Sequence, residues 1–191
     1  MNVKSLWVVG LVFFSLSARA AKESDLKKLT GVLEVKEECQ PLDFQGADMR
    51  IFSLDRPRDK GRIFKGANMK KANFSGMILK EMTFEEVDLE GATFENATIT
   101  SVNFKDCNLK GVNFKGVTYL YGSFRGADLQ GTTFEKADLE SLSYSGASLK
   151  ETLFKDGKLF RVSFERTKEK KDVSFEGADL KDCSGTGFRL F

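Results

Sequence analysis

Two residue types that often carry catalysis, His and Cys, are absent or sparse in this chain of 191 residues. His is absent, so the residue that usually moves protons near neutral pH is missing. Cys39, Cys107 and Cys183 are far apart, and their spacing fits neither a zinc site nor a disulfide framework. Glu85 and Glu86 are adjacent carboxylates, which a solvated outer face explains. No nucleophile elbow, phosphate-binding loop or dinucleotide fingerprint is present. We therefore expect no enzymatic activity, no metal and no cofactor.

The first twenty residues have the pattern of a secretory signal. Lys4 is followed by an apolar run over residues 6–16 and by Ala18-Arg19-Ala20, a small-residue cleavage site. We expect cleavage before Ala21 and a periplasmic or secreted protein without an integral membrane span. An uncleaved inner-membrane anchor is the alternative. Cleavage would leave equal numbers of basic and acidic side chains, so nucleic acid is not expected as a partner.

A five-residue repeat dominates the rest of the chain. Every fifth residue from Phe64 to Phe164 is bulky and apolar, and this series accounts for much of the 18 Phe. A small or medium-sized residue stands two places before most of them, a short polar residue often stands directly before them, and Gly often stands two places after them. A period of five matches neither a helix nor a flat strand, so the chain must turn a corner every five residues.

The bulky positions predict the structural core. The residues that we assign to it are Phe64, Phe74, Phe84, Phe94, Phe104, Phe114, Phe124, Phe134, Phe154, Phe164, Leu89, Leu109, Leu129, Leu139 and Leu149. Burial of each such side chain contributes about 1.5–3 kcal/mol to stability. Summed over all positions, this gain offsets a loss of chain entropy of comparable size.

The repeat units resemble the Ala-(Asp/Asn)-Leu signature of pentapeptide-repeat proteins. Examples are Gly66-Ala67-Asn68-Met69, Gly126-Ala127-Asp128-Leu129 and Gly177-Ala178-Asp179-Leu180. The resemblance implies an all-β fold, a right-handed quadrilateral parallel β-helix with four units per coil. It also implies that the bulky residue and the small residue two before it point inward. In family members a leader with two cysteines precedes the helix; Leu42 replaces the second one here, so we interpret Cys39 as a buried apolar residue.

Four units per coil would stack residues that are twenty apart. We expect Phe44 above Phe64 and Phe84 in one column, and Met49 above Met69 and Leu89 in another. Two charged segments interrupt the repeat, and both are interpreted as surface bulges; the alternative is that they are basic loops that bind an acidic partner, although each also carries acidic residues. The segment 55–62 is expected to leave the register unchanged, and the segment 165–172 adds one residue.

The exterior positions predict the surface. Charges alternate in sign along the columns, as in Glu95, Lys115, Glu135 and Lys155, whereas imitation of DNA needs a continuous negative face. One side differs, because Ile78, Leu120, Tyr121 and Phe160 all fall on its outside. Exposed apolar residues on one side favour a protein-binding patch, unless a terminal segment folds over them.

The carboxyl end carries Phe188, Leu190 and Phe191 outside the repeat. These residues either cover the last coil or pair two molecules. Gyrase-protecting members of the family dimerise through this end, so the resemblance implies that a homodimer is an alternative to the cap.

We thus expect residues 1–20 as a signal peptide, 21–39 as a cap segment that can be helical, 40–183 as the β-helix and 184–191 as a cap or dimerisation tail. The leading hypothesis for function is a noncatalytic scaffold, in the cell envelope or secreted space, that binds an unidentified protein. One alternative is a DNA-mimicking inhibitor of a topoisomerase or another DNA-binding enzyme, and a second is a secreted effector.

Overall fold

The structure is a computed structural model that describes residues 43–51 and 64–185. The expected signal peptide, the cap segment 21–39 and the tail residues Phe188, Leu190 and Phe191 lie outside these ranges. Within the ranges, no helix is long and apolar enough to cross a membrane.

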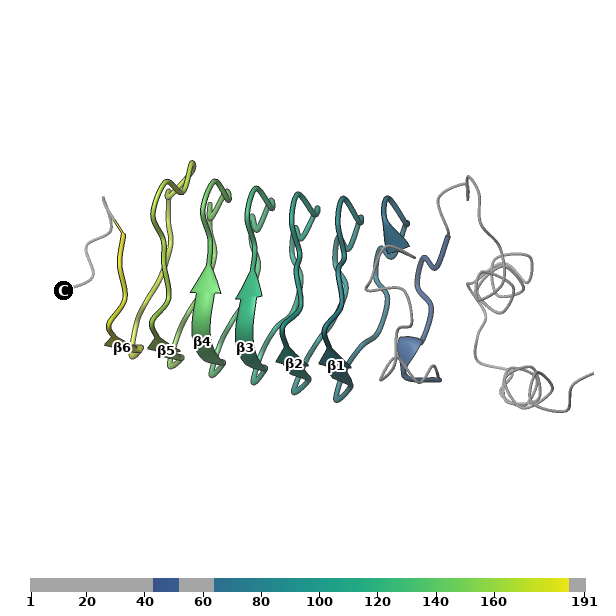
Figure 1. Cartoon of the computed structure of the whole chain (residues 1–191), viewed down its shortest axis with the longest axis horizontal. Helices are drawn as coiled ribbons and strands as arrows, with labels where there is room; N and C mark the ends of the chain where they lie inside the picture. The colour runs from purple at the N-terminus through teal and green to yellow at the C-terminus, as the bar shows by residue number, and fades with distance from the viewer. Residues whose placement is uncertain (1–42, 52–63, 186–191) are drawn as a thin grey trace, which may run out of the picture.

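The described chain winds into a parallel β-helix, which confirms the fold class (Figure 1). One short 3-10 helix comes first, and each later coil contributes one strand to a six-stranded parallel sheet in the order β1-β2-β3-β4-β5-β6. The elements are η1 (Met49–Ile51), β1 (Ile78–Lys80), β2 (Thr98–Thr100), β3 (Thr118–Ser123), β4 (Asp138–Ser143), β5 (Lys158–Phe160) and β6 (Asp179–Lys181). Isolated parallel bridges join successive coils elsewhere, for example Asp88 to Asn108.

The four sides of a coil are named here by their central residues. Side one carries Phe84, Phe104 and Phe124; side two carries Leu89, Leu109 and Leu129; side three carries Phe94, Phe114 and Phe134; side four carries Ile99, Tyr119 and Leu139. The sheet β1–β6 lies on side four.

Corners form where the residue two places after each bulky side chain adopts positive φ. Gly fills ten of these corners, such as Gly126 at 70°. Non-glycine residues fill others with φ between 53° and 58°, including Asn96 and Asp106. The left-handed conformation costs a non-glycine residue about 1–2 kcal/mol, so regular backbone pairing between coils must offset that cost. The backbone donors of Asn96 and Asp106 indeed reach the carbonyls of Lys115 and Arg125 at 2.9 Å.

The short polar residue that precedes many of the bulky positions stabilises the same corner. Asn103 Oδ1 accepts from the backbone N–H of Lys105 at 3.0 Å, and Asn113 Oδ1 accepts from that of Lys115 at 2.9 Å. Asn and Asp form such local turns readily. Asn108 also donates to Asp88 on the previous coil at 3.0 Å, so these residues link coils as well as corners.

Aromatic rings fill the interior in two columns. Rings on side three stack nearly parallel, with centroids 4.5 Å apart for Phe74 and Phe94 and 4.9 Å apart for Phe114 and Phe134. Rings of sides one and three meet edge to face, as do Phe104 and Phe114 at 5.8 Å. Both geometries suit the ring quadrupole. Every residue assigned to the core from the repeat lies in this interior with at most 1% of its surface exposed.

The expected stacking of the first coil is wrong. Asp43 pairs with Asn68, 25 residues later, and Asp48 pairs with Asn73. Phe44 therefore precedes Met69 on side two, and Met49 precedes Phe74 on side three. The interrupting segment adds a whole five-residue unit, which keeps the bulky side chains inside but moves them by one side.

The second interruption is confirmed as a one-residue insertion. Lys158 pairs with Asp179, and Ser163 pairs with Ser184, 21 residues later. Phe154 and Phe175 still stack with centroids 5.0 Å apart. The bulge is therefore absorbed before the chain reaches side three of the last coil.

Candidate interaction surface

Side four carries a stretch of exterior surface without charge. We call it the side-four patch, and it consists of Ile78, Thr98, Thr100, Ser101, Thr118, Leu120 and Tyr121. Strand pairing places Ile78 beside Thr98 and Thr98 beside Thr118. Ile78 and Tyr121 are 57% and 55% exposed, which makes them the most exposed large apolar residues of the described chain.

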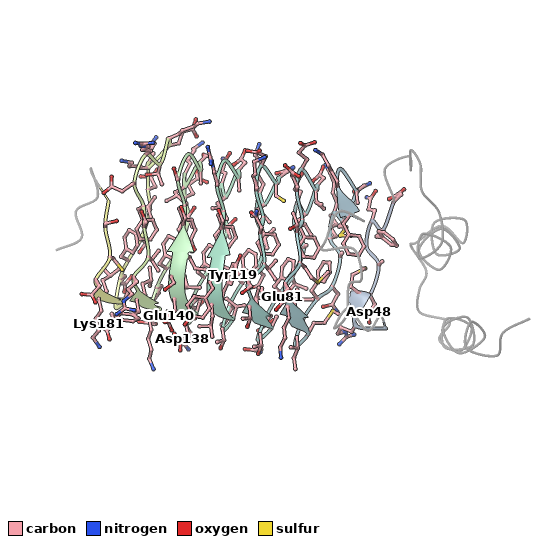
Figure 2. The ribbon with its side chains drawn as sticks, viewed as in Figure 1. Asp48, Glu81, Tyr119, Asp138, Glu140 and Lys181 are labelled. Atoms are coloured by element: carbon pink, nitrogen blue, oxygen red, sulfur yellow. The ribbon has the colours of Figure 1, made fainter. Side chains whose placement is uncertain are left out.

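Charged residues bound the patch on both ends. Lys80 pairs with Thr100 at the β1 end, and Glu140 pairs with Leu120 at the β4 end. Figure 2 shows Asp138 and Glu140 at the outer surface of β4, whereas Tyr119 of β3 points inward. The patch therefore spans β1 to β3 and stops at β4.

Phe160, which we grouped with this side from the sequence, lies apart from the patch. Glu140 separates it from Leu120, because β4 stands between β3 and β5. The guanidinium carbon of Arg161 lies 4.5 Å from the centre of the Phe160 ring, a cation–π distance. The structure thus places Leu120 and Tyr121 together on β3, puts Ile78 two coils away on β1 with the uncharged β2 between them, and leaves Phe160 beyond the charged row.

Tyr121 occupies a corner with φ 56°. A bulky residue in the left-handed region is strained, and such strain persists where other demands fix it. Neighbouring coils carry Ser101 and Ser141 at the same corner. The Tyr121 ring gains little there, because it is exposed and its hydroxyl is 3.5 Å from Glu140 Oε1.

The other three sides present paired charges. Glu85 Oε1 accepts from Lys105 at 2.7 Å, and Lys70 donates to Glu90 Oε2 at 2.9 Å on the next coil. The Lys70 ammonium lowers the pKa of the Glu90 carboxyl mainly through that hydrogen bond. These side chains are exposed to solvent, so screening leaves each pair with little effect on stability. Their main consequence is an outer surface of alternating sign.

The two cysteines that the structure describes, Cys107 and Cys183, are poor nucleophiles. Burial raises the pKa of the Cys107 thiol to about 12, and Cys107 Sγ contacts the Phe84 carbonyl oxygen. Burial also raises the pKa of Cys183, which is half-buried in the last coil. A thiol with a raised pKa is a poor nucleophile. Across residues 43–51 and 64–185, no three His, Cys, Asp or Glu residues gather as metal ligands do.

Sequence reasoning missed two features. Leu153 is 42% exposed on side three, where the other coils carry Thr93, Asn113 and Thr133. Its deviation from the short polar residues of that column was a readable signal. Gly122 occupies an inward small position beside Tyr119, and a methyl group at Gly122 would overlap the Tyr119 ring. Only the three-dimensional packing shows that pairing.

Solved structures with a similar fold cover much of the described chain. A pentapeptide repeat protein from the thylakoid lumen of Arabidopsis thaliana is 21% identical, covers 57% of this chain and 66% of its own, and has a TM-score of 0.37. Rfr23 from the cyanobacterium Cyanothece 51142 is 18% identical, with 74% and 79% covered and a TM-score of 0.42. QnrB1, a plasmid-mediated fluoroquinolone resistance protein, is 19% identical, with 76% and 77% covered and a TM-score of 0.31.

A search of curated proteins finds no significant match to the chain. Two sequence profiles do match it: the pentapeptide repeat region over residues 60–132 and pentapeptide repeats in eight copies over residues 123–156. Together they span just over half of the chain. From residue 64 on, the matched residues coincide with coils whose bulky side chains point inward and whose corners adopt positive φ. The chain therefore belongs to the pentapeptide-repeat family.

Proposed function

We propose that this protein is a noncatalytic rod that binds another protein through the side-four patch. The observation that carries the proposal is Tyr121, a large aromatic side chain that is 55% exposed at a left-handed corner within an uncharged stretch of surface. The fold has no need of an aromatic residue there, because Ser101 and Ser141 form the equivalent corners. Tyr is also enriched where proteins bind one another.

The chemistry of the patch favours a partner whose surface is apolar and carries uncharged groups that can hydrogen-bond to hydroxyls. Ile78, Leu120 and Tyr121 supply apolar area, and the Thr side chains supply hydroxyl groups without charge. The charged rows at Lys80 and Glu140 would form a polar rim. The alternating charges of the other sides do not favour imitation of DNA.

We further propose that the protein acts in the periplasm or in the secreted space. The support is the pattern of residues 1–20, with its apolar run and its Ala18-Arg19-Ala20 site. The rod would then work as a scaffold or binding module of the cell envelope.

Affinity capture with two matched glycine variants tests the binding proposal. Tyr121→Gly and Lys136→Gly each replace a non-glycine corner residue at φ 56°. Both should gain about 1 kcal/mol of stability because the left-handed strain is relieved. Only Tyr121→Gly should lose a specific bound protein that wild type and Lys136→Gly retain.

The mass of the recovered chain tests its location in the same experiment. A chain that begins at Ala21 supports export, whereas an intact chain in the cytoplasm contradicts it. Recovery of the same bound proteins with Tyr121→Gly as with wild type contradicts the role of the patch.

A further inference from the structure

Side two of the rod shows how a regular coil pairs with the coil before it. The polar residue ahead of each central side chain uses both of its backbone groups for this pairing. The Ser148 N–H donates to the Ala127 carbonyl at 3.0 Å, and the Ser148 carbonyl accepts from the Leu129 N–H at 2.9 Å. One residue thus makes two hydrogen bonds to the preceding coil.

In the last coil, two residues divide these hydrogen bonds between them. The Lys168 N–H donates to the Ala147 carbonyl at 2.9 Å. The Glu169 carbonyl accepts from the Leu149 N–H at 2.8 Å. Lys168 and Glu169 therefore both stand opposite Ser148, which is the arrangement of a β-bulge. The one-residue insertion of the second charged segment lies at this bulge.

The bulge places Lys170 in the interior column of side two. The Lys171 carbonyl accepts from the Glu151 N–H at 2.8 Å, so regular pairing resumes directly after Lys170. Lys170 therefore takes the central position that follows Leu149. Among the central positions that the structure describes from residue 64 to residue 180, Lys170 is the only charged residue. It is half-buried, whereas Leu149 is 0% exposed.

Both features oppose the addition of another coil. Natural sheets protect their edges with β-bulges and with charged residues at inward positions, and side two of the last coil has one of each. A coil that stacked on this one would cover Lys170 and remove its ammonium from water, which is unfavourable. Val173 and Leu180 of the same coil are apolar and only partly buried, so the rest of the coil would favour stacking.

We propose that Lys170 and the bulge before it keep the carboxyl end of the rod from joining a second copy of this chain. Joining of a carboxyl end to an amino end would repeat into a filament, and joining of two carboxyl ends would give a two-fold dimer. Both arrangements bury Lys170. The protein therefore works as a single rod whose sides bind partners. This inference does not depend on the side-four patch, because side two alone carries it.

The mass of Lys170→Leu in solution, measured by sedimentation equilibrium, tests the proposal. Wild type should have the mass of one chain. Lys170→Leu should self-associate about tenfold more tightly or more, because joining no longer buries a charge. The control Lys171→Leu makes the same change at an exposed position of the same coil and should behave like wild type. Deletion of Glu169 in the Lys170→Leu variant removes the bulge and should strengthen the association further.

Small-angle X-ray scattering shows where the copies meet. Joining at the ends should lengthen the particle without widening its cross-section. The proposal is overturned if Lys170→Leu keeps the wild-type mass, if its assemblies widen instead of lengthening, or if wild type itself is joined end to end. If circular dichroism shows that Lys170→Leu does not fold, Lys170→Met removes the charge from a side chain of similar length and gives the same comparison.

Discussion

Tyr119 and Tyr144 are both fully buried, but their hydroxyls meet different surroundings. The Tyr119 hydroxyl donates to the Val102 carbonyl at 2.6 Å. The Tyr144 hydroxyl is buried without a hydrogen-bond partner in the structure. Burial raises the pKa of both phenols. The same residue type therefore stabilises one coil and destabilises another, according to whether a carbonyl lies within hydrogen-bonding distance of its hydroxyl.

Tyr144→Phe is expected to raise the free energy of unfolding by about 1 kcal/mol, because it removes an unpaired buried hydroxyl. Tyr119→Phe is the control and should lower it by about 1 kcal/mol, because a made hydrogen bond is lost. Urea denaturation measures both. The idea fails if the two variants change stability in the same direction.

The advantage of Tyr144→Phe should grow at alkaline pH. The folded pKa of Tyr144 lies above its ordinary value of 10.0, so the phenol ionises in the unfolded state before the folded one, and the stability of the wild type falls as the pH rises above 10. Phe has no proton to lose. Denaturation at pH 8 and at pH 11 should therefore show a larger difference between variant and wild type at the higher pH.

At the scale of the element, β3 has a larger side chain than the other strands at one inward position and a smaller one at the inward position three residues later. Equivalent coils carry Leu or Ile at the centre of side four and Met82, Val102 or Leu142 three residues later. In β3 the central residue is Tyr119, and its hydroxyl occupies the space of the later side chain. A methyl group at Gly122 would lie 2.2 Å from the Tyr119 hydroxyl oxygen, so Gly is required.

Gly122→Ala should therefore destabilise the protein by about 1–3 kcal/mol, the usual cost of overpacking. Adding Tyr119→Leu should recover most of the loss, because Leu leaves that space open. The control Gly131→Ala has no atom within 4 Å of the new methyl group and should show only the backbone cost of φ 67°. Thermal unfolding of the single and double variants measures the coupling, and purely additive effects would contradict it.

At the scale of the whole molecule, each coil contacts only its neighbours. The backbone hydrogen bonds run from one coil to the next, as from Phe104 to Ser123 and from Phe124 to Ser143. In such a solenoid, stability is a sum over coils and their interfaces, and opening begins at an end. The partly buried last coil is the weaker end of the described chain.

Amide hydrogen exchange should accordingly form a gradient along the rod. The backbone N–H groups of β3 and β4 should exchange slowest. Those of β6 should exchange faster, because their free energy of opening is several kcal/mol lower. Phe114→Ala, in the middle, should speed exchange in the coils beside it more than in β6. Uniform protection from β1 to β6 would show that the rod opens all at once instead.

The period of five in the sequence determined that the chain turns a corner every five residues and identified the bulky side chains of the interior, and the resemblance of the units to pentapeptide repeats implied the β-helix with four units per coil. It also determined the one-residue insertion before Phe175, since the period itself shifts by one there. The alternating charges could be read in the same way, because exterior columns follow from the register. These features depend on spacing along the chain.

The tertiary structure decided what depends on contacts between coils. The sequence could not show that Phe44 precedes Met69, because an inserted segment of five residues preserves the period and hides the change of side. The sequence placed Phe160 on the same side as Tyr121, and the strand pairing confirms that side while putting Glu140 between Phe160 and Leu120. The pairing of Tyr119 with Gly122 emerged only from the fold, because the reach of a ring across the interior is set by its packing and not by its position in the repeat.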